Sequence, residues 1–169
     1  MKSSKSRYPY RLWLPGLLLL LWAIGLQPIS GLAAGLDTGP QLVVSHFSTA
    51  KVIASLKVES GDKFTIRYIH SVDKTPIFEE FRLDREKGLV LEKTWFTMFG
   101  AGLGHWPGHG KLSQDSEWIT IDNIEQPLDS FILRIGSPSV GHTIIYHDQE
   151  INLSRLAPGA RAWVEFKNQ

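Results

Sequence analysis

"FTIRYIHSVDKTPIFEEFRLD" spans residues 64–84 and contains two runs of alternating apolar and polar side chains on either side of a polar loop. Alternation with a period of two residues is typical of half-buried β-strands, and two such runs joined by a short loop predict an antiparallel hairpin. We expect His70 to lie opposite Ile77 across a six-residue loop. The apolar side chains of both runs then share one face, the core side of a sheet, and the opposite face pairs Arg67 with Glu80.

Two polar residues of the hairpin, His70 and Glu79, fall on this core face, with Tyr68 beside them. A carboxylate turned inward costs several kcal/mol unless it is paired, and His70, the Tyr68 hydroxyl or Lys74 from the loop could pair with it. One interpretation is a polar ligand site in which His70 titrates near neutral pH and Glu79 tunes its pKa. The other is a buried structural network that fixes the loop to the sheet.

The chain after its first 35 residues shows strand periodicity throughout. Nine short runs, rich in β-branched and aromatic residues, are separated by turn residues such as glycine and proline. They are residues 41–47, 51–58, 63–71, 77–84, 89–99, 117–121, 130–136, 143–148 and 161–167. No stretch holds a helical period beyond about two turns. We therefore expect residues 36–169 to form one all-β domain, an antiparallel β-sandwich or small barrel of about eight to nine strands.

One long connection, residues 100–117, has no periodic pattern. A loop of this length inside a compact domain is usually functional or mobile, and loops on a rigid β-scaffold often carry binding residues. The successive backbone N–H groups around Gly100 and Gly102 could cradle a carboxylate, or these glycines could simply form turns.

The first 35 residues have the composition of an export signal or a membrane anchor. Four basic residues and no acidic one precede a charge-free apolar stretch that begins at Leu12. Small residues at 31–35 favour a cleaved signal peptide, whereas the apolar length of residues 12–34 would also suit an anchor helix. Both interpretations keep the basic end in the cytoplasm and place the following domain outside the cytoplasmic membrane, in the periplasm or an equivalent compartment.

Charge and composition argue against several classes of function. Without the four leader charges the chain keeps 14 basic and 17 acidic residues, a net charge of −3, so we expect no binding to nucleic acid. The chain has no cysteine, and Pro107 and Gly108 interrupt the helical spacing of His105 and His109. We therefore expect no metal site and no cofactor. Because no nucleophile motif is present, the sequence favours a role without catalysis.

Two motifs, "YIHSVDKTPIFEEF" at residues 68–81 and "TWFTMFGAGLG" at residues 94–104, are similar to the pattern of the domain of unknown function 1850 family. The resemblance extends over residues 56–166. The matching positions are Tyr68, His70, Ser71, Val72, Glu79 or Glu80, Thr94, Phe99, Gly100, Ala101, Gly102 and Leu103. This resemblance implies a small exported bacterial protein that accompanies tripartite ATP-independent periplasmic (TRAP) transporters of the TAXI type.

Residues and resemblance together predict a non-enzymatic accessory or binding domain associated with TRAP transport of small acidic solutes. Its partner would be a membrane component of the transporter or a solute receptor, and its ligand a small carboxylate. We expect the functional polar cluster to comprise Tyr68, His70, Ser71, Lys74, Glu79, Gly100 and Gly102. Two alternatives remain open: a small enzyme or metal site built on His70 and Glu79, and a structural module of the cell envelope.

Overall fold

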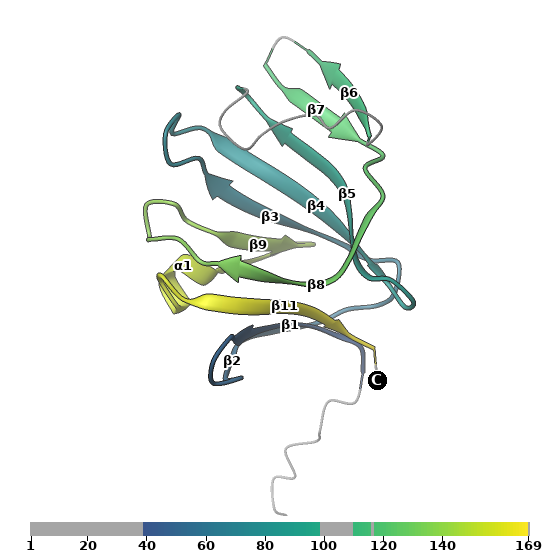
Figure 1. Cartoon of the computed structure of the whole chain (residues 1–169), viewed down its shortest axis with the longest axis vertical. Coiled ribbons are helices and arrows are strands. Elements are labelled where there is room, and N and C mark those ends of the chain that lie inside the picture. Colours follow the sequence, from purple (N-terminus) through teal and green to yellow (C-terminus); the bar gives the residue numbers. More distant parts are fainter. Residues whose placement is uncertain (1–38, 99–109, 116, 169) are drawn as a thin grey trace, which may run out of the picture. The chain divides into compact units, whose positions relative to one another are not determined.

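Eleven β-strands and one helical turn are present in the computed structural model, which describes residues 39–98, 110–115 and 117–168 (Figure 1). The strands are β1 (Gln41–His46), β2 (Val52–Lys57), β3 (Lys63–Ile69), β4 (Pro76–Asp84), β5 (Gly88–Phe96), β6 (Lys111–Gln114), β7 (Ile119–Asp122), β8 (Gln126–Arg134), β9 (Thr143–Tyr146), β10 (Gln149–Asn152) and β11 (Arg161–Lys167). The helix α1 (Leu153–Leu156) lies between β10 and β11 in the chain.

All strand pairs within the described residues are antiparallel, and nine strands follow one path in the order β10-β9-β3-β4-β5-β8-β11-β1-β2. The remaining two branch from this path, because β7 pairs with the second half of β5 and β6 pairs with β7. The sheet curls into a nearly closed barrel. Near the two ends of the path, α1 contacts both β2 and β9. The predicted all-β antiparallel fold is therefore confirmed, in its barrel form.

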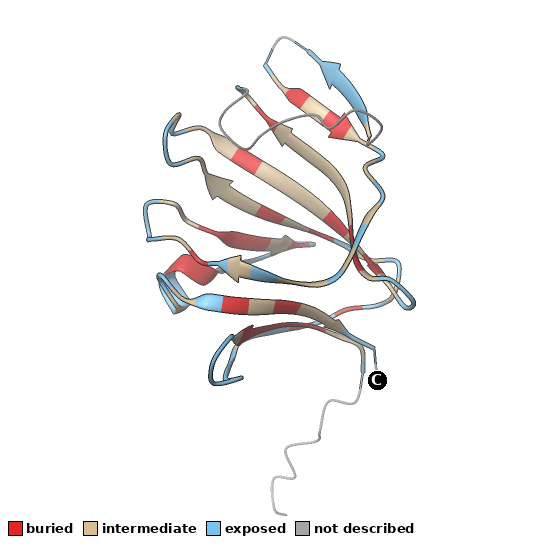
Figure 2. Cartoon of the chain, in the orientation of Figure 1, coloured by how far each residue is buried: buried red, intermediate tan, exposed pale blue. Residues whose placement is uncertain are grey.

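Two apolar clusters form the core of the fold. The larger one contains Phe64, whose ring stacks on that of Phe81 directly opposite, with the ring centroids 5.2 Å apart. The smaller one consists of Ile77, Phe96, Ile119 and Ile121 from β4, β5 and β7. Figure 2 shows buried positions on most strands of the barrel. Tyr68 packs against both clusters, so its side chain lies at the boundary between them.

The hairpin of β3 and β4 has the predicted faces but not the predicted register. Ile69 lies opposite Pro76 and Tyr68 opposite Ile77, which shifts the pairing by two residues. A shift by an even number leaves every side chain on its predicted face. Proline has no N–H to donate, yet it is tolerated as the first residue of a strand, and Pro76 occupies that position in β4.

The new register also changes the ion pairs on the outer face. Arg67 binds Glu150 of β10 through two hydrogen bonds of 3.0 and 3.3 Å, and Glu80 pairs with Lys63 at 3.2 Å. The predicted contact of Arg67 with Glu80 is therefore wrong. The cause is that β10, a polar edge strand absent from the sequence prediction, supplies the carboxylate.

Three elements were not predicted from the sequence: β6, β10 and α1. The first corrects the prediction of an aperiodic loop at residues 100–117, because the described part of that connection contains β6 paired with β7. The rest of the connection up to residue 109 lies outside the described residues, as does the predicted leader at residues 1–35. In the part of the chain that the structure describes, no helix has the length and apolar character needed to cross a membrane.

Candidate functional site

Three polar side chains meet at the boundary of the two apolar clusters: Tyr68 of β3, Glu79 of β4 and His142, which immediately precedes β9. We refer to them as the inner polar cluster. Glu79 lies opposite Ile66 on one side and Thr94 of β5 on the other. The rings of Tyr68 and His142 are stacked, with their centroids 5.0 Å apart. Side chains alternate along a strand, so Tyr68 shares the inner face of β3 with Phe64 and Ile66 and points toward the core.

Glu79 is a partly buried carboxyl with little to stabilise its charge. Among the described residues, its side chain has one hydrogen bond, donated by the Tyr68 hydroxyl to Oε1 at 3.5 Å. A bond of that length is weak. Burial raises the pKa of Glu79 above its ordinary value, and the Tyr68 hydrogen bond offsets this only in part. Burial, followed by the adjacent Glu79 charge, raises the pKa of Tyr68, which keeps its hydroxyl protonated.

His142 is held in one orientation and one tautomer. Its Nδ1 accepts a hydrogen bond from the Gly136 backbone N–H at 3.0 Å, so in the neutral ring the proton sits on Nε2. Burial lowers the pKa of His142, which favours this neutral form. The backbone N–H of His142 donates to the hydroxyl of Ser154 in α1 at 2.9 Å, which ties the start of β9 to the helix.

The structure separates His70 from Glu79, contrary to the expected pair. His70 lies just beyond β3, and its Nδ1 is 2.8 Å from the Asp73 carboxylate and 3.3 Å from the Asp73 backbone N–H. The backbone N–H of His70 donates to the Thr75 carbonyl at 2.8 Å, and this hydrogen bond closes the hairpin loop. The shifted register explains the error, since the strand pairing ends at Ile69.

The other predicted site residues lie apart from the inner polar cluster or outside the described residues. Lys74 and Ser71 are exposed in the hairpin loop, where the Lys74 ammonium donates to the Ser71 carbonyl at 2.6 Å. Gly100 and Gly102 fall outside the described residues. Of the predicted cluster, the structure therefore brings together Tyr68 and Glu79.

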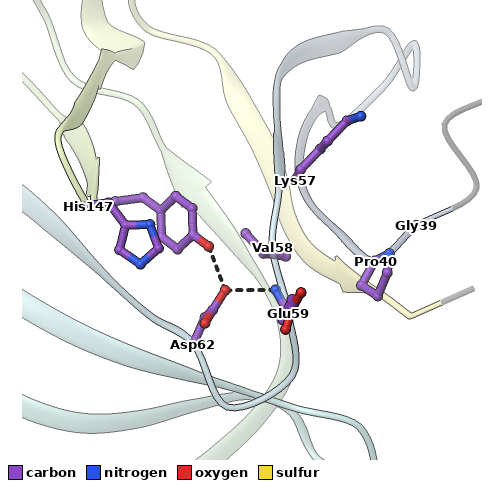
Figure 3. Close-up of a pocket in the computed structure, with 8 residues that line it drawn as sticks. Gly39, Pro40, Lys57, Val58, Glu59, Asp62 and His147 are labelled. Atoms are coloured by element: carbon purple, nitrogen blue, oxygen red, sulfur yellow. Dashed lines mark hydrogen bonds between the residues drawn. The ribbon is translucent and has the colours of Figure 1, made fainter.

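A second feature is an open pocket of about 470 Å³ near the start of the described chain (Figure 3). The Asp62 carboxylate lies at its edge and accepts hydrogen bonds from the Tyr146 hydroxyl and the Glu59 backbone N–H. The bond from Tyr146 is the main cause that lowers the pKa of Asp62, while burial and this bond raise the pKa of Tyr146 to about 12. His147 stacks on Tyr146 with the ring centroids 4.1 Å apart.

This pocket has the contacts of a structural junction. The backbone N–H of Leu83 donates to the Asp62 carbonyl, and the backbone N–H of Gly61 donates to the Leu83 carbonyl. These two hydrogen bonds connect the β2–β3 turn to β4. The Tyr146 hydroxyl fastens the same turn to β9. The exposed charges around the pocket are mixed, with Lys57 and Glu59 of opposite sign. We therefore assign the hydrogen bonds around this pocket the role of stabilising the fold. No three His, Cys, Asp or Glu side chains of the described residues are grouped to hold a metal ion.

Sequence reasoning missed His142, although the signal was present. The strand alternation of residues 143–148 places Ile144 and Tyr146 on the inner face, and both are buried. One step further back in this alternation is His142. Extending the pattern beyond the apolar run would have added it to the inner face.

Comparisons with known proteins agree with the motifs of the hairpin. The family described as "Domain of unknown function (DUF1850)" matches residues 64–153, more than half of the chain. This segment contains Tyr68, Glu79 and His142. Neither the curated proteins nor the solved structures include a significant match. The chain belongs to the DUF1850 family.

Proposed function

We propose that this protein is an exported, non-enzymatic accessory domain for TAXI-type TRAP uptake of small acidic solutes, and that the inner polar cluster binds the solute. The leader-like composition of residues 1–35 supports export. The resemblance of the two motifs to DUF1850 proteins that accompany TRAP transporters supports the transport role. The partner would be the transporter's membrane component or its solute receptor.

The observation that carries the binding site is the carboxyl of Glu79. It lies on the inner face of the barrel, between Ile66 and Thr94, with a single hydrogen bond of 3.5 Å among the described residues. A buried polar group with so little compensation lowers stability, and such groups are retained chiefly where they serve function. Glu80, the next residue, is outward-facing and paired with Lys63, so the contrast is local to one strand.

The alternative of an enzyme or metal site on His70 and Glu79 receives less support from the geometry. A catalytic pair needs the two groups within hydrogen-bond reach. His70 is instead occupied by Asp73, whose carboxylate lies 2.8 Å from its Nδ1.

Uptake of labelled small organic acids tests the proposal in cells that lack the gene and carry either the wild-type protein, Glu79→Ala or the matched control Glu80→Ala. Wild-type protein and Glu80→Ala should restore uptake, and Glu79→Ala should not, at equal protein abundance in the extracytoplasmic fraction. Normal uptake in cells without the gene would contradict the transport role. Full activity of Glu79→Ala would contradict the assignment of the site.

A further inference from the structure

The inner polar cluster offers hydrogen-bond donors that carry no charge. The Tyr68 hydroxyl donates to Glu79 over 3.5 Å, a contact weak enough to be exchanged for a better acceptor. His142 carries its proton on Nε2, because Nδ1 is occupied by the Gly136 N–H. A protonated Glu79 would add a second hydroxyl next to that of Tyr68. Two neutral hydroxyl donors side by side match the two oxygens of a carboxylate.

We propose that Glu79 binds the solute in its protonated form, so that the site takes up one proton with each carboxylate. This inference rests on the proposed function and specifies its chemistry. The proton comes from solvent: an ionised Glu79, a proton and a carboxylate combine into a complex in which Glu79 O–H and Tyr68 O–H both donate to the ligand. No covalent bond forms or breaks other than that O–H bond.

The surroundings of Glu79 explain why a proton, rather than a positive side chain, would neutralise the site. From β3 it meets Ile66 and Tyr68, and from β5 it meets Thr94, whose hydroxyl is already bonded to the Phe78 carbonyl at 3.0 Å. The ring of His142 stacks on that of Tyr68, and burial lowers the pKa of His142, which favours its uncharged form. Among the described residues, no Lys or Arg forms an ion pair or a hydrogen bond with Glu79. Two carboxylates without a cation repel each other, so binding requires that one of them be protonated.

Calorimetric titration of the purified domain with pyruvate, lactate and succinate tests the inference between about pH 5 and pH 9, in buffers of different ionisation enthalpy. For wild-type protein we expect affinity to fall by about tenfold per pH unit above the pKa of free Glu79, with uptake of close to one proton per ligand. The matched control Glu80→Gln should behave like the wild type.

Two variants separate the roles of the donors. Glu79→Gln carries a permanent neutral donor, so its affinity should be independent of pH and no proton should be taken up. Tyr68→Phe lacks one donor, so its affinity should be lower at every pH while the pH dependence remains. Binding by wild-type protein without any pH dependence, or loss of binding in folded Glu79→Gln, would overturn the inference alone. Absence of binding to every carboxylate at every pH would overturn the proposed solute binding.

Discussion

Burial inside the barrel disfavours the carboxylate form of Glu79 and raises its pKa above the ordinary value. Its neighbours are Ile66, Thr94 and the Tyr68 hydroxyl, and burial is the larger of the two effects on its pKa. A folded-state pKa above the unfolded value means that the folded protein binds the proton more tightly. Stability is then greatest below the unfolded pKa, about 4.3 for Glu, and falls as the pH rises toward the folded pKa.

We therefore predict that Glu79→Gln stabilises the protein at neutral pH. The gain should be about 1.4 kcal/mol for each unit by which folding raises the pKa of Glu79, and it should vanish near about pH 4. Urea unfolding at both pH values measures it. The control is Glu80→Gln, whose exposed pair with Lys63 should contribute at most about 1 kcal/mol at neutral pH. A loss of stability in Glu79→Gln at neutral pH would show that the carboxylate is well paired.

The opposite pH dependence is expected at Asp62. The hydrogen bond from the Tyr146 hydroxyl lowers the pKa of Asp62. The ionised Asp62 therefore stabilises the folded protein above the unfolded Asp pKa of about 3.9, and this stabilisation is lost as the pH falls through the folded pKa. Tyr146→Phe should cost about 1 to 2 kcal/mol at neutral pH, because it removes a donor to a charged group. Thermal or urea unfolding of Tyr146→Phe, Asp62→Asn and the double mutant measures the coupling. Additive losses would show that the two side chains do not interact in solution.

The turn between β4 and β5 depends on the absence of a side chain at Gly88. Its φ is +67°, and a Cβ atom there would lie 2.3 Å from the Asp129 carbonyl oxygen of β8. Gly159 has a similar φ of +76° but open space around it. Gly159→Ala should therefore show only the cost of left-handed backbone, about 1 kcal/mol.

We predict that Gly88→Ala destabilises the barrel by at least about 2 kcal/mol more than Gly159→Ala, because β5 and β8 must move apart. Denaturant unfolding of the two variants gives this difference directly. Equal losses would mean that the approach of β5 to β8 is looser than the structure shows.

The strands that pack against the core could be predicted from the sequence, whereas the exposed edge elements could not. β3 and β4 alternate between apolar and polar residues because one face of each is buried, and this contrast is visible in the sequence. All four residues of β6 are exposed, so that segment shows no such contrast. The predicted register of the hairpin was wrong, because alternation determines which face each side chain occupies but does not distinguish between pairings that differ by two residues.

Across the whole domain, the site residues come from segments far apart in the chain. Tyr68 and Glu79 share a hairpin, and their common face was predictable from alternation alone. His142 reaches Tyr68 because β9 pairs with β3, a contact between segments more than 70 residues apart that no local pattern encodes. The contact of His70, in contrast, is local. His70 pairs with Asp73, three residues further along the same loop, and not with Glu79 on the neighbouring strand as the sequence predicts.

The proposed role requires the barrel to lie outside the cytoplasmic membrane. We predict that the protein fractionates with the periplasm or the outer face of the membrane. N-terminal sequencing should give a start near residues 34–36 if the leader is cleaved, and the full leader if it serves as an anchor. Recovery of the protein in the cytoplasm with an intact Met1 would contradict export.

We propose that the inner polar cluster presents Glu79 as a neutral donor to a carboxylate ligand. A nuclear magnetic resonance titration that follows the side-chain carboxyl carbon of Glu79, with and without saturating pyruvate, tests it most directly. We predict a pKa above the ordinary Glu value of about 4.3 in the free protein and a further rise when pyruvate binds. A Glu79 pKa at or below the ordinary value, unchanged by pyruvate, would contradict the claim.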